Sequence, residues 1–212
     1  MTIIVVAGTG TAIGKTWVSA ELVTALRRHE IPVVARKPVQ SFDPEDATPT
    51  DADVLGGATG EDPHVVCPRH RWLPRAMAPP IAAAALGAEP FTIAELATEV
   101  TASAPHDGIV LVESAGGVRS PLAADGDTIT LVRALRPARV VLVADATLGT
   151  INLVRMSIDA LVGHDTVVYL NRFDADLEVH ARNHDWLVTQ EGLEVVTNPE
   201  ALEYVVGGLA FT

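Results

Sequence analysis

A glycine-rich segment near the start of the chain has the residues of a phosphate-binding loop. It reads AGTGTAIGKTW over residues 7–17 and contains Gly14-Lys15-Thr16. Backbone N–H groups and the start of a following helix can surround an anion, Lys15 can reach the terminal phosphates, and the Thr16 hydroxyl can bind Mg²⁺. The common spacing G-x-x-x-x-G-K-[ST] would put a glycine at Thr9, but the glycines lie on either side of it. A helix-capping glycine turn is the alternative interpretation.

Polar side chains also follow later apolar runs of the sequence. Lys37 follows one such run, ahead of a proline, where a cation has little structural purpose. Glu113 follows four apolar residues and precedes a flexible turn, a place that suits a metal ligand or a phosphate-facing loop. Asp51 could cap a helix after Thr50, and Asn171 could read a nucleotide base with an amide that both donates and accepts. These segments read RKPVQS, VESAGGV, TPTDAD and YLNR.

Short β-branched runs alternate with helical patterns, and this order predicts an α/β fold with a doubly wound, mostly parallel sheet flanked by helices. Near-continuous apolar runs suit strands that are buried on both faces. In such sheets ligands bind beyond the carboxyl ends of the strands, where the polar segments are expected to lie. The predicted strands are Ile3–Ala7, Val33–Ala35, Ile109–Val112, Val140–Ala144, Thr166–Leu170 and Leu193–Val196. The predicted helices are Lys15–Arg28, Asp51–Thr59, Ala76–Leu86, Ile93–Ala104, Ile129–Leu135, Ile151–Val162 and Leu177–Thr189.

The composition fits one globular domain over residues 1–212. A formal charge of −12 argues against nucleic acid as a partner, because phosphate backbones need a positive surface. The sequence has no apolar run long enough to predict a membrane span, and its N-terminus does not read as a signal peptide. The single cysteine cannot form an internal disulfide. We therefore predict a cytoplasmic protein without nucleic-acid or membrane partners.

Taken in order, GTGTAIGKT, KPVQS, TDAD, VESAGG and the closing NR resemble the dethiobiotin synthetase family. The loop of that family reads G-T-x-T-x-x-G-K-T, which residues 8–16 match throughout, so the unusual glycine spacing is the family's own variant. MAPPIAA at residues 77–83 and LGTIN at residues 148–152 are further matches. The resemblance covers most of the chain, is strongest in residues 1–160, and implies a P-loop NTPase-like fold.

The resemblance implies an ATP- and Mg²⁺-dependent carbon–nitrogen ligase of biotin biosynthesis. One amine of 7,8-diaminononanoate would take up CO2 to give a carbamate, and the γ-phosphate of ATP would activate it as a mixed anhydride. The second amine would then expel phosphate and close the ring of dethiobiotin. Because two anions must meet, fixed positive charge has to offset their repulsion. The family is typically homodimeric, and we expect the same here.

Motif matching assigns roles to individual residues. Lys37 and Lys15 would be the catalytic cations, with Lys37 nearest the carbamate, and Asn171 would read adenine. The Mg²⁺ ligands would be Thr16, Asp51 and Glu113. The substrate-binding residues would be Thr11, Ser41 and Gly117. The ATP-binding residues would be Ala12, Ile13, Gly14, Lys15, Thr16, Trp17, Asp51, Glu113, Ser114, Ala115, Gly116, Asn171 and Arg172.

The sequence departs from the family pattern at a few positions. Ser114 stands where the family has glycine, so a side chain is expected near the phosphates, and Phe42 replaces a glycine after the KPV segment. Leu153 replaces a histidine. The C-terminal part lacks a G-x-I-P segment, for which residues 195–202 are the expected counterpart.

Three other functions stay open at this point. A partitioning or metal-insertion ATPase would have an additional lysine early in the loop, and none precedes Lys15. A paralogue that binds nucleotide without synthetase activity would account for Ser114 and Phe42. A cobyrinate amidase-type synthetase would need a glutamine-hydrolysing domain, for which 212 residues leave no room.

Overall fold

A parallel sheet forms the centre of the molecule. The computed structural model describes residues 1–104 and 107–211, so part of the domain predicted over 1–212 lies outside the described residues. Within them, a six-stranded sheet has the order β10-β9-β8-β1-β5-β2, and each pair of neighbours is parallel. Its strands are β1 Thr2–Gly8, β2 Val33–Arg36, β5 Ile109–Glu113, β8 Arg139–Asp145, β9 Thr166–Asn171 and β10 Val195–Val196. The predicted doubly wound architecture is confirmed.

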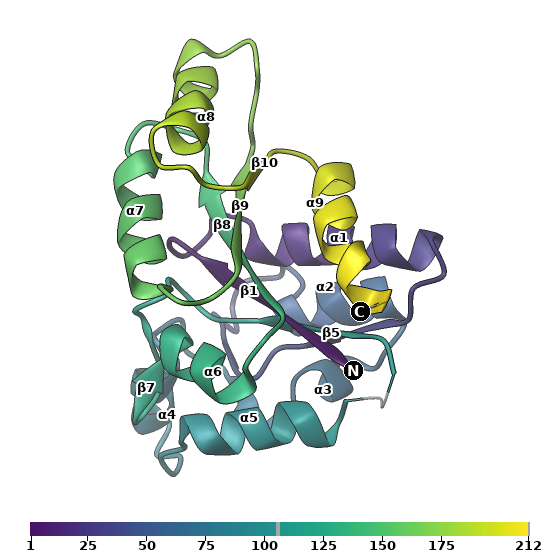
Figure 1. Ribbon diagram of the computed structural model, residues 1–212. Coiled ribbons are helices and arrows are strands. Elements are labelled where there is room, and N and C mark those ends of the chain that lie inside the picture. The colour runs from purple at the N-terminus through teal and green to yellow at the C-terminus, as the bar shows by residue number, and fades with distance from the viewer. Residues whose placement is uncertain (105–106, 212) are drawn as a thin grey trace.

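Helices cover both faces of this sheet (Figure 1). They are α1 Lys15–Arg28, α2 Asp51–Thr59, α3 Pro63–Val66, α4 Pro79–Ala85, α5 Ile93–Ala102, α6 Thr128–Leu135, α7 Thr150–Ala160, α8 Glu178–Thr189 and α9 Pro199–Gly207. Short 3₁₀ segments are η1 Arg69–Arg71 and η2 Gly208–Phe211. Two small sheets pair β3 Gln40–Ser41 with β4 Trp72–Leu73, and β6 Pro121–Ala123 with β7 Gly126–Asp127.

The predicted helix bounds agree with the structure to different degrees. The first two predicted helices have the observed bounds, and the second begins after Thr50, whose side chain forms a capping box with Asp53. The helix predicted over Ala76–Leu86 is shorter, because it begins at Pro79, and proline suits the first helical position. Helix α9 was not predicted; Asn198 caps it and Pro199 opens it.

The inner strands of the central sheet are buried on both faces. In β1, Ile4 and Val6 pack with α1 and α9, whereas Ile3, Val5 and Ala7 pack on the opposite face with helices that include α5, α6 and α7. This period of two follows from the pleat of the strand. The sheet is therefore a rigid platform whose carboxyl ends hold the loops described below.

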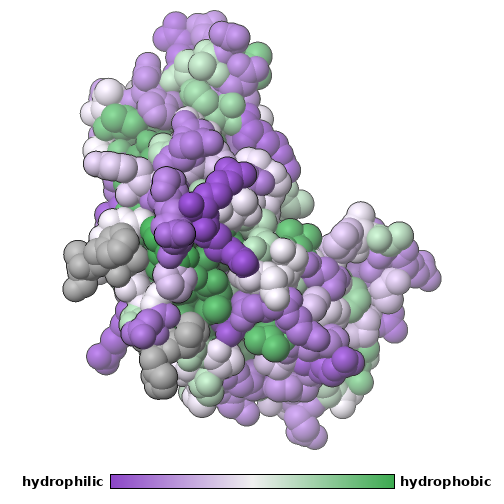
Figure 2. Space-filling model, turned by 90° about the vertical axis from the view of Figure 1, so that its right-hand side faces the viewer, coloured by the Kyte–Doolittle hydropathy of each residue, from purple (hydrophilic) through white to green (hydrophobic). Residues whose placement is uncertain are grey.

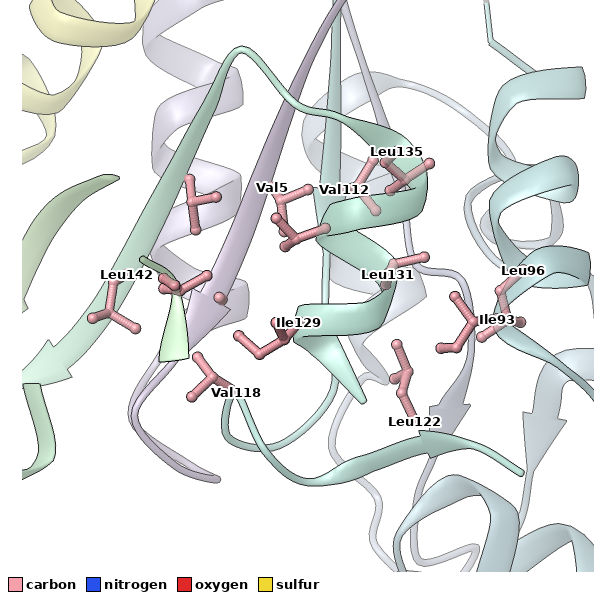
Figure 3. Packing of buried hydrophobic residues seen from close by; sticks show 14 of the residues in the cluster. Val5, Ile93, Leu96, Val112, Val118, Leu122, Ile129, Leu131, Leu135 and Leu142 are labelled. Carbon is pink, nitrogen blue, oxygen red and sulfur yellow. The ribbon is translucent and has the colours of Figure 1, made fainter. Parts of the chain in front are cut away.

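The core between the sheet and α6 is assembled from side chains of several elements (Figure 3). In that view the labelled side chains Leu131 and Leu135 of α6 lie between Val112 of β5 and Ile93, which is at the start of α5. Each such side chain contributes on the order of 1.5–3 kcal/mol when it is fully buried. This packing fixes α6 against the sheet.

The outer surface differs from this interior. Figure 2 shows hydrophilic residues over most of one side of the molecule, with the end that contains α8 standing above the rest. In the part of the chain that the structure describes, no helix combines the length and apolar character needed to cross a membrane.

Candidate active site

The glycine-rich loop between β1 and α1 is held by the end of β9. Gly14 has φ 89° and precedes α1, and a Cβ added to it would lie 2.1 Å from Asn171 Nδ2, so only glycine fits. Asn171 Nδ2 donates to Ile13 O at 2.8 Å, and Arg172 Nη2 donates to Ala12 O at 3.2 Å. These two bonds hold the loop through its carbonyl groups. Because α1 has no side-chain cap, its first N–H groups are available to an anion.

Lys15 lies at the start of α1 and is nearly buried. Its Nζ donates to Gly10 O at 2.9 Å. Burial, together with the nearby positive charge of Lys37, lowers the pKa of Lys15 to about 8, although Glu113 and Asp51 oppose the shift. A phosphate in the loop would supply the counter-charge that this ammonium group needs.

Polar side chains from distant parts of the chain form a cluster around Lys37 at the carboxyl end of the sheet. Lys37 follows β2 and is 2% exposed. Its Nζ lies 2.6 Å from Asp51 Oδ2 and 2.8 Å from Glu113 Oε1, and it donates to Ser114 O at 3.1 Å. Thr16 Oγ1 lies 2.7 Å from Asp51 Oδ1 and 2.9 Å from Glu113 Oε1. The loop, β2, α2 and β5 therefore converge on one charged cluster.

The charges of this cluster support one another. Burial alone disfavours a charged lysine, but Glu113 and Asp51 outweigh it and raise the pKa of Lys37 above its ordinary value. In turn Lys37, with smaller contributions from Thr16 and Lys15, lowers the pKa of Asp51 despite the burial of that carboxyl group. Lys37 is therefore an ammonium group, and Asp51 a carboxylate, across the neutral pH range.

The oxygen atoms of the cluster fit a hard divalent cation. Glu113 is fully buried, and its Oε2 has no hydrogen-bond partner among the described residues. Hydroxyl and carboxylate oxygens of Thr16, Asp51 and Glu113 are the donors that Mg²⁺ prefers, usually one or two carboxylates completed by phosphate and water. Within the described residues no group of three or more His, Cys, Asp or Glu side chains could hold a metal ion.

A cavity of about 530 Å³ opens over this cluster. The predicted site residues that line it are Thr11, Ala12, Lys15, Thr16, Lys37, Ser41, Asp51, Glu113, Ala115 and Gly116. Its wall also contains residues to which the sequence analysis gave no role, namely Gln40, Ala76, Met77, Ala78, Pro79 and Ser120. The MAPPIAA match pointed to part of this second set.

A second cavity, of about 560 Å³, lies beside the end of β9. Trp17, Asn171 and Arg172, three of the residues predicted to bind ATP, line it. Its other lining residues were not singled out for binding, and they are Tyr169, Phe173, Thr197, Asn198 and Pro199. The last three lie in the segment expected to replace G-x-I-P, so that segment does reach a cavity.

Four predicted site residues, Ile13, Gly14, Ser114 and Gly117, line neither cavity. Gly117 lies behind the loop, where an added Cβ would be 3.3 Å from Thr9 O. Ser114 is fully buried, and its N–H donates to Val6 O while its carbonyl accepts from Lys37. Its φ is not positive, so a glycine is not required there and its side chain does not enter the cavity.

Phe42 also has a structural place. Its ring packs edge-on against Trp72, with centroids 5.9 Å apart, and its N–H donates to Leu73 O. Phe42 is not in the positive-φ region either. The aromatic pair joins the segment after β3 to β4, and glycine at this position would lose that contact.

Sequence relatives of this chain share one description. The family model described as an AAA domain matches residues 2–185. A Caulobacter protein named ATP-dependent dethiobiotin synthetase is 42% identical over 161 residues, which cover 74% of this chain and 68% of that protein. A Haloferax mediterranei protein with the same name is 35% identical over 198 residues, covering 92% of this chain and 82% of the relative.

Solved structures show a shared fold. Chloroplast FtsY from Physcomitrella patens superposes with a TM-score of 0.57 and 16% identity, covering 92% of this chain but 56% of that protein. A ParA family ATPase from Chlorobium tepidum gives a TM-score of 0.54 with 11% identity, covering 92% of this chain and 82% of the ATPase. At these identities the likeness extends to the fold alone, so it gives no support to a partitioning function.

Proposed function

Because this chain belongs to the family of ATP-dependent dethiobiotin synthetases, which are ligases of biotin biosynthesis, we propose that its two cavities bind ATP, CO2 and 7,8-diaminononanoate. One amine of the diamine adds to CO2 and loses a proton, giving a carbamate. A carbamate oxygen attacks the γ-phosphorus of ATP and displaces ADP. The second amine attacks the carbamoyl carbon, expels phosphate, loses a proton and closes the cyclic urea.

The observation that carries this proposal is the enclosed ammonium group of Lys37. It lies at the wall of the first cavity, against Asp51 and Glu113, in the same cavity as Lys15 and Thr16. Carbamate and γ-phosphate repel each other, and fixed positive charge in a partly enclosed site offsets that repulsion without reorganisation. Lys37 would hold the carbamate, and Lys15 would neutralise the phosphate oxygens as it leaves Gly10 O.

We propose Mg²⁺ as the resident cation of the cluster. Thr16, Asp51 and Glu113 would hold it, and the best support is Glu113 Oε2, which has no hydrogen-bond partner in the described part of the chain. When bound, the ion would screen the charge that develops on the transferring phosphoryl group. The chain itself keeps three oxygen atoms together at the mouth of the loop. Thr16 Oγ1 lies 2.7 Å from Asp51 Oδ1 and 2.9 Å from Glu113 Oε1.

The remaining ATP and substrate contacts follow from the cavity walls. In the second cavity Asn171 donates through Nδ2 to Ile13 O, so its Oδ1 would accept from the amino group of adenine, with Trp17 beside the base. In the first cavity Thr11 and Ser41 would contact the diamine or the carbamate. Met77 and Pro79, which line the same cavity, would contact the alkyl chain of the diamine. Holding amine and anhydride in contact removes an entropic barrier of up to ~7–11 kcal/mol.

The test is phosphate release from Mg²⁺·ATP and bicarbonate, with and without 7,8-diaminononanoate, with the product followed by mass spectrometry. We expect release that depends on the diamine and one dethiobiotin formed per phosphate. Nucleotide binding without diamine-dependent product would contradict the proposal and favour a nucleotide-binding paralogue.

We further propose that the chain acts as a homodimer. The start of α7 and the loop before it expose Leu148 (88%), Leu153 and Met156 (64%), which suits burial against a second copy. Met156→Glu should shift the protein from dimer to monomer in sedimentation velocity. An unchanged dimer in that variant, or a monomeric wild type, would exclude this face as the interface.

The domain and the location complete the proposal. We propose that the chain works as one domain, since strands from residue 2 to residue 196 form one sheet. The loop between β1 and α1 lines the first cavity, and Trp17, in the first turn of α1, lines the second. An enzyme that consumes ATP and CO2 for a vitamin belongs in the cytoplasm, which we propose as its compartment.

A further inference from the structure

Gln40 is a buried amide that contacts both neighbours of Asp51. It is the first residue of β3, three residues after Lys37, and is 2% exposed. Its Oε1 accepts from Ala52 N at 3.0 Å, and its Nε2 donates to Thr50 Oγ1 at 3.3 Å. We propose that Gln40 is a positioning residue that holds Asp51 beside Lys37 and thereby sets the affinity of the site for a divalent cation with ATP. This inference rests on the proposed role of Asp51.

The N-terminal end of α2 has backbone donors that need partners outside the helix. The first N–H groups of a helix have no partner inside the helix. The capping box formed by Thr50 and Asp53 satisfies Asp53 N and Thr50 N, whereas Ala52 N is satisfied by Gln40. Asp51 lies between the two residues that Gln40 touches, so the amide holds the backbone of Ala52 on one side of the carboxylate and the capping hydroxyl of Thr50 on the other.

Gln40 also supplies a connection that the chain between β3 and α2 does not provide. Residues 43–49 are exposed, and a cavity of about 280 Å³ lies between this loop and Gln40. The loop therefore restrains the start of α2 weakly. The side chain of Gln40 links the segment that holds Lys37 directly to the helix that holds Asp51.

The rest of α2 does not depend on this link. Ala52 and Leu55 pack in a small cluster with Ala35, Val66 and Cys67. At the other end of the helix, Arg27 Nη1 donates to Ala58 O and Thr59 O. Loss of the Gln40 amide should therefore displace the carboxylate without unfolding the helix.

Gln40→Met tests the inference, since it keeps an unbranched side chain of similar length and removes both hydrogen bonds. Thr59→Val is the matched control, because the Thr59 hydroxyl is buried and bonds Leu55 O at the far end of the same helix. Binding of the preformed Mn²⁺·ATP complex to the protein is measured by equilibrium dialysis, because ATP on its own also binds Mn²⁺. Thermal unfolding is measured in parallel.

We expect Gln40→Met to weaken Mn²⁺·ATP binding about five- to tenfold. A change of this size corresponds to the net contribution of about one hydrogen bond that holds Asp51 in place. Thr59→Val should lower the unfolding temperature and leave Mn²⁺ binding unchanged. Wild-type Mn²⁺ affinity in Gln40→Met overturns the inference, and so does an equal loss in Thr59→Val. If Gln40→Met does not fold, Gln40→Ala, which leaves room for water at Ala52 N, replaces it with the same expectations.

Asp51→Asn separates this inference from the proposed function. A large loss of Mn²⁺ affinity in Asp51→Asn together with none in Gln40→Met overturns only the role of Gln40. Unchanged affinity in Asp51→Asn overturns the metal role of Asp51 itself, and the role of Gln40 with it.

Discussion

Lys37 is the side chain whose surroundings say most about the site. Its ammonium group is enclosed by protein and faces the carboxylates of Asp51 and Glu113. Removing one partner of a buried ion pair leaves an uncompensated charge, which costs more than the pair contributes. Lys37 therefore stabilises the site before any substrate arrives, besides its proposed role toward the carbamate.

At the residue scale we predict that Lys37→Met abolishes turnover and lowers the free energy of unfolding by about 3–5 kcal/mol, because Glu113 stays fully buried without its counter-charge. Mg²⁺ should recover part of that loss, since a cation can replace the ammonium group between the carboxylates. Urea unfolding with and without Mg²⁺ measures both effects. A variant as stable as the wild type, or one insensitive to Mg²⁺, would show that Lys37 does not balance this cluster.

The turn after β5 forms one wall of the first cavity. Gly116 has φ 68°, and a Cβ there would meet Ser120 Cβ and Oγ at 2.8 Å. Ser120 Oγ in turn accepts from Gly117 N at 3.1 Å, so the turn has little room to adjust. Gly57, inside α2, has nothing within 4 Å of an added Cβ, so the space there is open.

At the element scale we predict opposite effects for two glycine-to-alanine changes. Gly116→Ala should destabilise the protein by at least about 1 kcal/mol and reduce kcat, because the positive φ and the contact with Ser120 both oppose a side chain. Gly57→Ala should stabilise it by about 0.5–1 kcal/mol and leave kcat unchanged. Thermal unfolding and steady-state kinetics of both variants test this prediction. Equal changes in unfolding temperature and in kcat for the two variants would contradict it.

For the whole molecule, the parallel sheet is the platform that brings the site together. The loop after β1, Lys37 after β2, Glu113 at the end of β5 and Asn171 at the end of β9 all lie at its carboxyl edge. Asp51 comes instead from α2, which packs on the edge of the sheet through the small cluster that contains Cys67. Burial raises the pKa of the Cys67 thiol to about 12.

The pKa of Cys67 predicts how stability depends on alkaline pH. The thiol stays protonated in the folded state between its ordinary pKa of 9.0 and about 12, whereas in the unfolded chain it ionises. Stability is therefore complete below pH 9 and falls as pH rises through this window, by up to about 1.4 kcal/mol per pH unit. Cys67→Ala should lose stability less steeply than the wild type between pH 9 and pH 10.5 in urea titrations. Parallel slopes would mean that the folded protein does not hold this thiol protonated.

Local signals in the sequence determined much of this molecule. Buried β-branched runs predicted the strands of the central sheet, and helical patterns predicted the bounds of α1 and α2, because both depend on neighbours within a few residues. The cap of α2 is Thr50, whereas the sequence suggested Asp51, which is the first residue of the helix. The rule that ligands lie beyond the carboxyl ends of parallel strands predicted that Lys15, Lys37 and Glu113 would meet, which they do at one cavity.

Contacts between residues far apart in the chain were decided only by the tertiary structure. Asn171 holds the loop at Ile13 across a separation of 158 residues, and no local pattern could disclose that bond. The place of Ser114 outside the cavity and the reach of Gln40 to both sides of Asp51 likewise depend on how separate elements pack. Sequence specifies which groups are present and which strand end bears each of them. Packing decides their distances, burial and partners, because these are properties of several segments at once.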